Sequence, residues 1–389
     1  MSGEGDCVHR ARAVAPLIAA AAPRIEAERA LPPDVLAALH EARLFRMLLP
    51  RSIGGDEVMP ADFFAAMEIL GAADASAAWC VGQGAGCGMS AAYLAPEAAR
   101  AVFGAADAVL AWGPLGRDAR AVVVDGGFRV SGTWHFASGS RHASWLGAHC
   151  IVYTADGQPQ RDGEGKPIER TMLYPKARAT VTDNWQVMGL KGTGSDSYSV
   201  TDLFVPSAYA FARDTAADRR ETGALYCFTS FSLYGVAFAG VALGIARTTL
   251  DAFIALARDK VSSNAKNPLR ENAVIQSQVA MAEAKLLSAR GFLVETLHEN
   301  GRAAVEQGGF TLDQRIRLRL AATWASLQAR EVVDAAYHAA GATAIFESNP
   351  FERRFRDIHT VSQQVQAHVA NFEIVGQCLL GFDPKSRVV

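Results

Sequence analysis

The sequence predicts an α+β protein in which helices come first, a strand-rich unit follows and a helical bundle ends the chain. Apolar residues recur at helical spacing before residue 108, alternate as in strands from 109 to 225, and return to a long helical period after 226. We therefore expect an N-terminal helical domain at 1–108, a central antiparallel β domain at 109–225 and a C-terminal four-helix-type bundle at 226–389.

Length and composition limit the possible functions. The chain has 389 residues, half of them hydrophobic, which is typical of a globular protein with a large core. Its 38 basic and 40 acidic residues give a net charge of −2, so no basic surface for nucleic acid is expected. The six cysteines are scattered and form no CxxC pair, which argues against a zinc site and favours reduced thiols in the cytoplasm.

The N-terminal part carries ordinary helix signals. Pro33 and Asp34 suit the start of a helix over 35–43, and the spacing within 62–73 is helical. A glycine-rich run at 82–88 follows no convincing strand. We therefore interpret it as tight helix packing rather than as a dinucleotide-binding fingerprint.

One uncharged segment, Thr222 to Ala246, is long enough to cross a membrane. It contains serines, a tyrosine and several glycines, and it continues directly into the amphipathic stretch 247–259. A buried central helix is therefore favoured over a membrane span, and no membrane partner is expected. Apolar residues four and three apart from Ile275 to Leu293 predict a packing seam in the same bundle.

The middle of the chain predicts strands. Asp125-Gly126-Gly127 separates two short apolar runs and predicts a hairpin. Further strands are predicted at Gly147–Thr154, Thr171–Tyr174, Ala179–Met188 and Ser197–Pro206.

The stretch from Trp134 to Trp145 combines a strand end with small residues. Ser138 supplies a hydroxyl there, Ala137 and Gly139 leave room beside it, and Trp134 and Phe136 can pack nearby. Such a sheet edge can receive a flat polar ring. An ordinary strand end with a turn is the alternative.

Several segments, in their order along the chain, resemble the acyl-CoA dehydrogenase superfamily. They are Leu44–Gly55, which ends in Gly-Gly, then Met188–Ser195, Leu203–Pro206 and Arg353–Thr360. The resemblance covers nearly the whole chain and implies that superfamily's α, β, α architecture.

The region after Arg356-Asp357 separates two branches of this superfamily. Acyl-CoA dehydrogenases commonly place a catalytic carboxylate shortly after such a pair, but no carboxylate occurs from Ile358 to Ala370. The segment instead resembles the flavin-dependent monooxygenases of the same fold, which include the oxygenase components of 4-hydroxyphenylacetate hydroxylase and dibenzothiophene monooxygenase. Their Phe-Arg-Asp-x-His-Thr-like segment supplies an active-site histidine, and their Trp-x-Phe-x-Ser-Gly stretch places a serine near flavin N5.

This resemblance implies a monooxygenase that receives reduced flavin, FADH2 or FMNH2, from a separate reductase. Reduced flavin and O2 would form a C4a-hydroperoxide that oxygenates a small aromatic or heteroaromatic substrate. Ser138 would protect this species through a hydrogen bond at N5, and His359 would act as general acid or base. Relatives of this fold are commonly tetramers, so a homotetramer is expected.

The resemblance also implies a set of cofactor-binding residues. They are Trp112, Gly113, Pro114, Trp134, Ser138, Gly139, Lys191, Thr193, Asn264, Lys266 and Gln276. A histidine that several family members carry shortly after the position of Trp79 has no counterpart at 84–88.

Two alternatives stay open at this point. The first is an FAD dehydrogenase or oxidase of the acyl-CoA dehydrogenase type, with its base at Glu347 or Glu352. The second is a non-catalytic helical-bundle assembly protein that keeps the fold.

Overall fold

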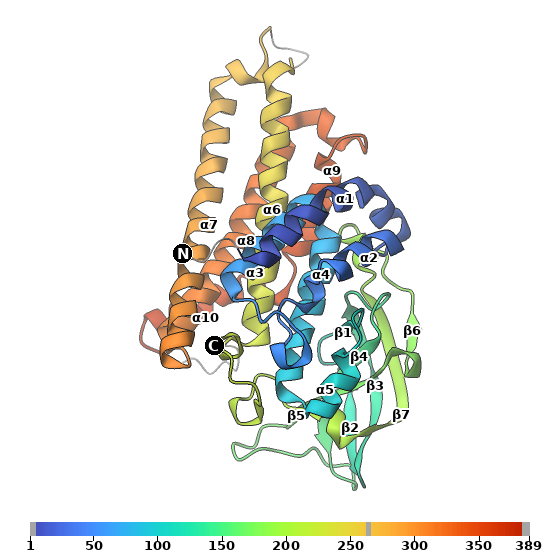
Figure 1. The fold of residues 1–389 in the computed structure, drawn as a ribbon. Helices are drawn as coiled ribbons and strands as arrows, with labels where there is room; N and C mark the ends of the chain where they lie inside the picture. The colour runs from blue at the N-terminus through green and yellow to red at the C-terminus, as the bar shows by residue number, and fades with distance from the viewer. Residues whose placement is uncertain (1–4, 262–265, 383–389) are drawn as a thin grey trace.

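A computed structural model describes residues 5–261 and 266–382 and shows two groups of helices beside one sheet (Figure 1). The first group is α1 Asp6–Glu28, α2 Pro33–Glu41, α3 Pro60–Ala73, α4 Ala75–Gly88 and α5 Pro96–Phe103. The second group is α6 Ser230–Asp259, α7 Ala273–Gln307, α8 Leu312–Ala340, α9 Phe351–Val361 and α10 Ala370–Leu379. The strands are β1 Leu110–Trp112, β2 Arg120–Val124, β3 Gly127–Ala137, β4 Trp145–Tyr153, β5 Glu169–Pro175, β6 Thr180–Thr182, β7 Asp196–Pro206 and β8 Ala210–Phe211. The predicted α+β order is therefore confirmed.

The helix ends follow from local sequence signals. Pro33 begins α2, as expected, because its fixed φ suits the first helical turn. Asp74 caps α4 by accepting a hydrogen bond from the Ala77 backbone N–H at 2.9 Å. At α8, Thr311 and Gln314 form a reciprocal capping box.

The glycine-rich run lies within α4 and packs against α6. A Cβ on Gly86 would stand 2.4 Å from Cε1 of Tyr234, so only glycine allows this approach. The expectation of tight helix packing is confirmed. The two helices thereby bring the side chains of α4 close to those of α6.

Helix α6 lies in the middle of the helical layer (Figure 1). Among the described residues, one helix, Ser230–Asp259, is long and apolar enough to cross a membrane, and most of that stretch is buried inside the protein. Its packing against α3, α4 and α8 agrees with the expectation of a central bundle helix.

The sheet is mixed rather than purely antiparallel, which corrects the prediction. Its strand order is β6-β7-β3-β2-β4-β5-β8, with β1 also paired to β4, and both β1 and β2 run parallel to β4. The reason is topological: the connection after β3 steps over β2 to reach β4, so β2 lies between two strands that run in opposite directions. The predicted strand at Ala179–Met188 shortens to Thr180–Thr182.

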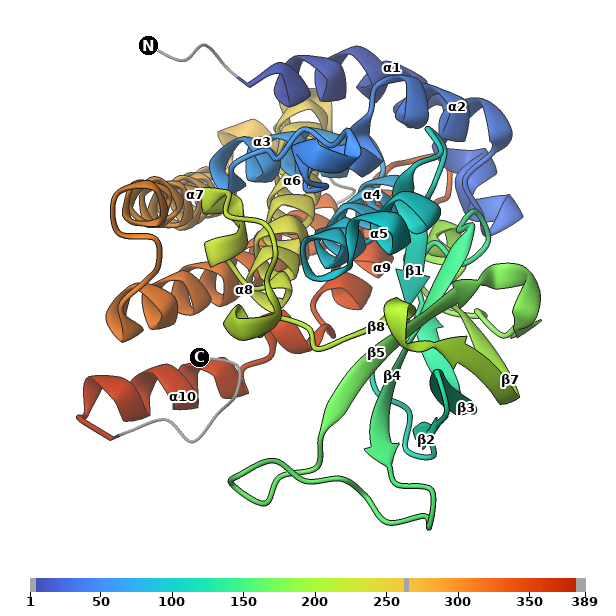
Figure 2. The ribbon, with the colours of Figure 1, turned by 60° about the horizontal axis from the view of Figure 1, so that its bottom comes forward.

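Two buried clusters organise the part of the chain that positions the site. One joins the N-terminal helices to α6, α7 and α8, and the other fills the sheet around Trp134 and Tyr198. Figure 2 shows the sheet beside the helices, with β1 next to α4 and α5. The divisions at 108 and 225 stay a prediction.

Candidate functional site

A β-bulge at the end of β3 determines which aromatic side chain reaches the surface. Trp134 pairs with Tyr198 and Ala137 with Asp196, so three steps on β3 oppose two on β7. Phe136, inside this bulge, has a φ of +60° and a side chain that is 63% exposed. A non-glycine residue in this backbone region is uncommon and strained, and such strain concentrates at functional sites.

The neighbouring Trp134 is a core residue, which corrects its assignment as a cofactor contact. Its side chain is fully buried, stacks on Tyr198 with ring centroids 5.4 Å apart, and donates a hydrogen bond to the His149 carbonyl at 3.0 Å. The extra residue of the bulge explains the error, because it changes which side chains of the strand end face outward. Phe136 presents its ring instead, against the edge of Trp185.

Ser138 begins a chain of three buried hydroxyls, which we call the hydroxyl chain: Ser138, Ser195 and Thr193. The Oγ atoms of Ser138 and Ser195 are 2.7 Å apart, and Ser195 Oγ lies 2.7 Å from Thr193 Oγ1. Thr193 donates to the Leu190 carbonyl at 2.8 Å, and Trp79 Nε1 donates to Ser138 Oγ at 2.9 Å. Ser138 is therefore held by α4 on one side and by the turn at residues 190–195 on the other.

The hydroxyl chain is anchored to α9 through Leu190. The Leu190 backbone N–H donates to Asp357 Oδ1 at 2.7 Å. Burial raises the pKa of the Asp357 carboxyl to about 7, and the nearby Asp74 carboxylate adds to the increase. Burial likewise raises the pKa of Asp74 to about 6. Two buried carboxyls with raised pKa values, Asp357 and Asp74, thus lie next to the Leu190 end of the hydroxyl chain and at the start of α4.

Aromatic and polar side chains of α4 and α6 form a surface that we call the α4–α6 wall: Trp79, Gln83, Cys87, Tyr234 and Phe238. The rings of Trp79 and Phe238 stack with centroids 3.6 Å apart. Gln83 Nε2 and Cys87 Sγ lie 3.5 and 3.4 Å from the Tyr234 hydroxyl. Burial raises the pKa of the Tyr234 phenol well above its usual value. Cys87, Tyr234 and Phe238 are buried, so the wall is a neutral, mostly apolar packing layer that reaches Ser138 through Trp79.

His359 lies on the opposite face of α9 from Asp357. Its Nε2 is 2.8 Å from Asp334 Oδ1 of α8, and its ring packs against Phe355. The side chains of this pair are about one-third exposed. The structure therefore gives His359 a carboxylate partner but does not bring it to Ser138.

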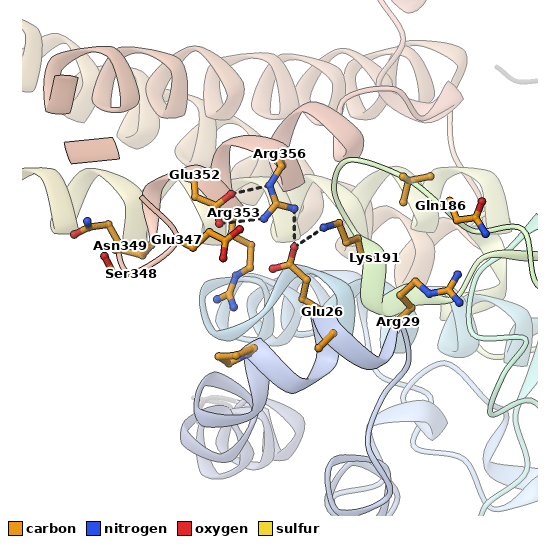
Figure 3. Close-up of a pocket in the computed structure, with 14 residues that line it drawn as sticks. Glu26, Arg29, Gln186, Lys191, Glu347, Ser348, Asn349, Glu352, Arg353 and Arg356 are labelled. Atoms are coloured by element: carbon orange, nitrogen blue, oxygen red, sulfur yellow. Dashed lines mark hydrogen bonds and ion pairs between the residues drawn. The ribbon is translucent and has the colours of Figure 1, made fainter. Parts of the chain in front are cut away.

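A charged cavity of about 940 Å³ lies between α1, the 186–191 segment and the start of α9. Figure 3 shows the side chains that line it. Glu26 lies at its centre, 3.0 Å from Lys191 Nζ and 2.7 Å from Arg356 Nη1. Glu347 and Glu352 also line this cavity, and Glu352 pairs with Arg356. Lys191 thus points away from the hydroxyl chain, and neither glutamate is placed as a base beside Ser138.

A second cavity, of about 890 Å³, lies where β5 approaches the starts of α6 and α8. Phe228, Phe231, Ser232, Asn300 and Arg213 are among its lining residues. It ends within one helical turn of Tyr234 along α6.

The remaining sequence-predicted residues fall into two places. Trp112 ends β1 and is buried in the cluster that it shares with the N-terminal helices. The N–H of the following Gly113 donates to the Tyr198 hydroxyl at 3.2 Å, and Pro114 is exposed beside them. Gly139 follows Ser138 with a φ of +79° and donates to the Thr193 carbonyl. These residues share the Ser138 end of the sheet.

Two other predicted contacts lie near the start of α7: Lys266 precedes this helix and Gln276 lies in its first turn. Lys266 and Gln276 are exposed there, and Gln276 donates to the Arg270 carbonyl at 2.8 Å. Asn264 lies outside the described residues. Within the described residues, a single chain does not bring Lys266 or Gln276 to Ser138.

Comparisons with known proteins identify the family. Residues 236–369 match the model "Acyl-CoA dehydrogenase, C-terminal domain". The chain is 31% identical over 361 residues to indole-3-acetate monooxygenase of Pseudomonas putida, covering 92% of this chain and 89% of the relative. The chain belongs to the flavin-dependent monooxygenases of the acyl-CoA dehydrogenase superfamily.

This monooxygenase also resembles other members along its length. It is 28% identical to the oxygenase component of an FADH(2)-dependent resorcinol hydroxylase from Rhizobium sp. (strain MTP-10005), covering 98% of this chain and 95% of that protein. Its fold matches XiaF from Streptomyces sp., solved with FADH2 and glycerol, with a TM-score of 0.90 at 23% identity over 98% of this chain and 97% of the other. The protein is thus an oxidoreductase of this family, and the dehydrogenase and scaffold alternatives are set aside.

The Ser138 end of the sheet combines two groups that a planar ring could contact. The Phe136 ring is exposed, and the Ser138 hydroxyl lies two residues further along, held by Trp79 and Ser195. Within residues 5–261 and 266–382, no group of three His, Cys, Asp or Glu side chains gathers as a metal site requires.

Sequence reasoning missed the partners that hold Ser138. Trp79 and Asp357 lie 59 positions before and 219 positions after it, on different helices. Phe136 was expected, with Trp134, to pack near such a ring, but the bulge that exposes it was not predicted.

Proposed function

We propose that this monooxygenase is the oxygenase component of a two-component system that oxygenates a small aromatic or heteroaromatic substrate. A separate reductase would deliver reduced flavin, and O2 would supply the oxygen atom. The names of the relatives support an aromatic substrate, because one acts on indole-3-acetate and another on resorcinol. The aromatic α4–α6 wall beside Ser138 supports the same substrate class.

The observation that carries the proposal is the buried Ser138 hydroxyl at a strained strand end, next to an exposed aromatic ring. When bound, reduced flavin supplies the electrons that activate O2 and the atom-transfer chemistry that oxygenates substrate. Ser138 would accept a hydrogen bond from the N5–H of that ring. Phe136, Pro114 and Gly139 would surround the ring, and the α4–α6 wall would keep water away.

Other predicted residues have indirect roles in this proposal. Trp112 and Gly113 shape the floor of the ring site, and Thr193 acts through Ser195 rather than by touching the ring. Lys191 would contribute charge near the cavity of Figure 3. Both FADH2 and FMNH2 fit these contacts, because the two share one ring system.

His359 is the proposed acid–base group. Its support is the Asp334 carboxylate, which holds one ring nitrogen and leaves Nδ1 for proton exchange, as in catalytic pairs that orient a histidine. The Tyr234 hydroxyl in the α4–α6 wall is the competing proton donor, because it lies nearer to Trp79.

We propose a homotetramer, and the exposed apolar residues of α7 support it. Val274, Met281, Leu287 and Val305 are all more than half exposed. The apolar surface of α6, by contrast, is covered within the chain. Lys266 and Gln276 can meet a Ser138 site only in a second copy, so their proposed cofactor contact and the assembly are linked. Light scattering that shows a stable monomer would contradict the assembly.

We also propose a cytoplasmic location, in line with the six free cysteine thiols.

The function is tested by supplying chemically reduced FAD or FMN together with O2 and a panel of indoles, phenols and resorcinols. The expected result is an oxygenated product that carries one atom from labelled O2. If bound FAD is instead bleached anaerobically by an acyl thioester and no labelled product forms, the enzyme is a dehydrogenase and the proposal is wrong.

A further inference from the structure

The hydroxyl chain has a direction, and that direction follows from its two ends. The Leu190 carbonyl can only accept, so Thr193 donates its single hydroxyl hydrogen to it. Ser195 must then donate to Thr193, and Ser138 must donate to Ser195. At the other end, the Trp79 N–H can only donate, so Ser138 Oγ accepts from it.

The hydrogen of Ser138 is therefore committed inside the protein. Its oxygen has one lone pair left and can serve a ligand only as an acceptor. The opposite direction is possible only if Thr193 turns its hydrogen from Leu190 to Ser195. That arrangement has one internal hydrogen bond fewer, since the Leu190 carbonyl would keep only Trp185 Nε1 and the Thr193 N–H.

The hydroxyl chain is held firmly enough by its surroundings to keep this direction of hydrogen bonding. All three hydroxyl residues are buried. Gly139 donates to the Thr193 carbonyl at 3.0 Å, and Ser140 Oγ donates to the Gly194 carbonyl at 3.1 Å, so the two segments are tied together on both sides. Asp357 holds the Leu190 N–H at 2.7 Å and thereby fixes the residue that ends the chain.

We propose that Thr193 and Ser195 are positioning residues that orient the Ser138 hydroxyl as an acceptor, so that the site selects the redox state of its flavin. Reduced flavin carries a hydrogen on N5 and can donate to Ser138. Oxidised flavin has a lone pair on N5, which would face the lone pair of Ser138. This orientation of the Ser138 hydroxyl favours binding of reduced flavin and release of oxidised flavin. An enzyme that receives its reduced flavin from a separate reductase needs this preference.

This inference rests on the proposed contact between Ser138 and flavin N5. The test measures dissociation constants of oxidised FAD, and of reduced FAD under anaerobic conditions, and compares their ratio among variants. In Thr193→Val and Ser195→Ala the Ser138 hydrogen becomes free to point outward. The ratio of oxidised to reduced dissociation constants is expected to fall about fivefold to tenfold, the effect of about one hydrogen bond.

Matched variants separate orientation from simple loss of structure. Thr193→Ser keeps the hydroxyl and is expected to keep the wild-type ratio. Thr249→Val removes a buried threonine hydroxyl in α6 that donates to the Ile245 carbonyl, away from the hydroxyl chain, and should leave the ratio unchanged.

The outcomes distinguish this inference from the proposed function. If Ser138→Ala changes the ratio while Thr193→Val and Ser195→Ala do not, the orientation is wrong and the N5 contact stands. If Ser138→Ala also leaves the ratio unchanged, the N5 contact is wrong as well. If the wild-type protein binds neither redox state, the proposed function itself fails.

Discussion

The two faces of α9 carry polar groups in different environments: a buried carboxyl on one face and a partly exposed imidazole on the other. Asp357 faces inward, is buried, and is linked through Leu190 to the hydroxyl chain. His359 faces α8, is partly exposed, and has Asp334 as its hydrogen-bond partner. Residues two apart on a helix point about 200° away from each other, so one short motif serves two separate environments. Adjacency in a motif therefore does not mean adjacency in a site.

The largest expected effect comes from the exposed face. His359→Ala should keep reduced-flavin affinity and lose about 10²–10⁴ in the rate of product formation, as expected for the loss of one acid–base group. His338→Ala, at the exposed end of α8, is the control. Full coupled oxygenation by the His359 variant would show that the inner face alone carries the chemistry.

Asp334, the carboxylate beside His359, gives a second test of the exposed face of α9. Asp334→Asn should lower product formation by about 10–100-fold if it orients the imidazole, since second-layer partners of a histidine commonly have effects of this size. Rates that match the wild type while His359→Ala is impaired would assign Asp334 to surface charge only. Steady-state kinetics at several pH values measures this.

On the buried face of α9, Asp357 should affect the free energy of unfolding rather than the rate of product formation. Burial raises the pKa of Asp357 from 3.8 to about 7, so the folded protein retains a proton that the unfolded chain releases. This contribution to stability is fully present at low pH and is lost as pH rises from about 4 to 7. Each pKa unit corresponds to about 1.4 kcal/mol, so the loss is on the order of a few kcal/mol.

Asp357→Asn keeps an oxygen for the Leu190 N–H and removes the titration. The melting temperature of the variant relative to wild type should therefore increase by a few degrees between pH 4 and pH 8. Thermal unfolding at these two pH values measures it. A difference that is constant with pH would contradict the burial of an ionisable Asp357.

The order of helices and strands could be predicted because hydrophobic periodicity is local. Ser138 could also be named as a candidate, because a strand end and a family-like stretch mark it, and its contact with flavin stays a prediction. The bulge at Phe136 could not be predicted. One added residue changes which side chains of the strand point outward, and the amino-acid composition of the segment does not indicate it. The partners Trp79, Ser195 and Asp357 come from other elements, so only the folded chain reveals the hydroxyl chain.

The most direct test of the account concerns Ser138 itself and needs no organic substrate. The protein is loaded with reduced flavin, mixed with O2, and the release of hydrogen peroxide is followed over time. The wild type should release peroxide more slowly than free flavin, and Ser138→Ala should release it several-fold faster than the wild type. Equal release by the two proteins, at the rate of free flavin, would contradict the assignment of Ser138 to flavin N5.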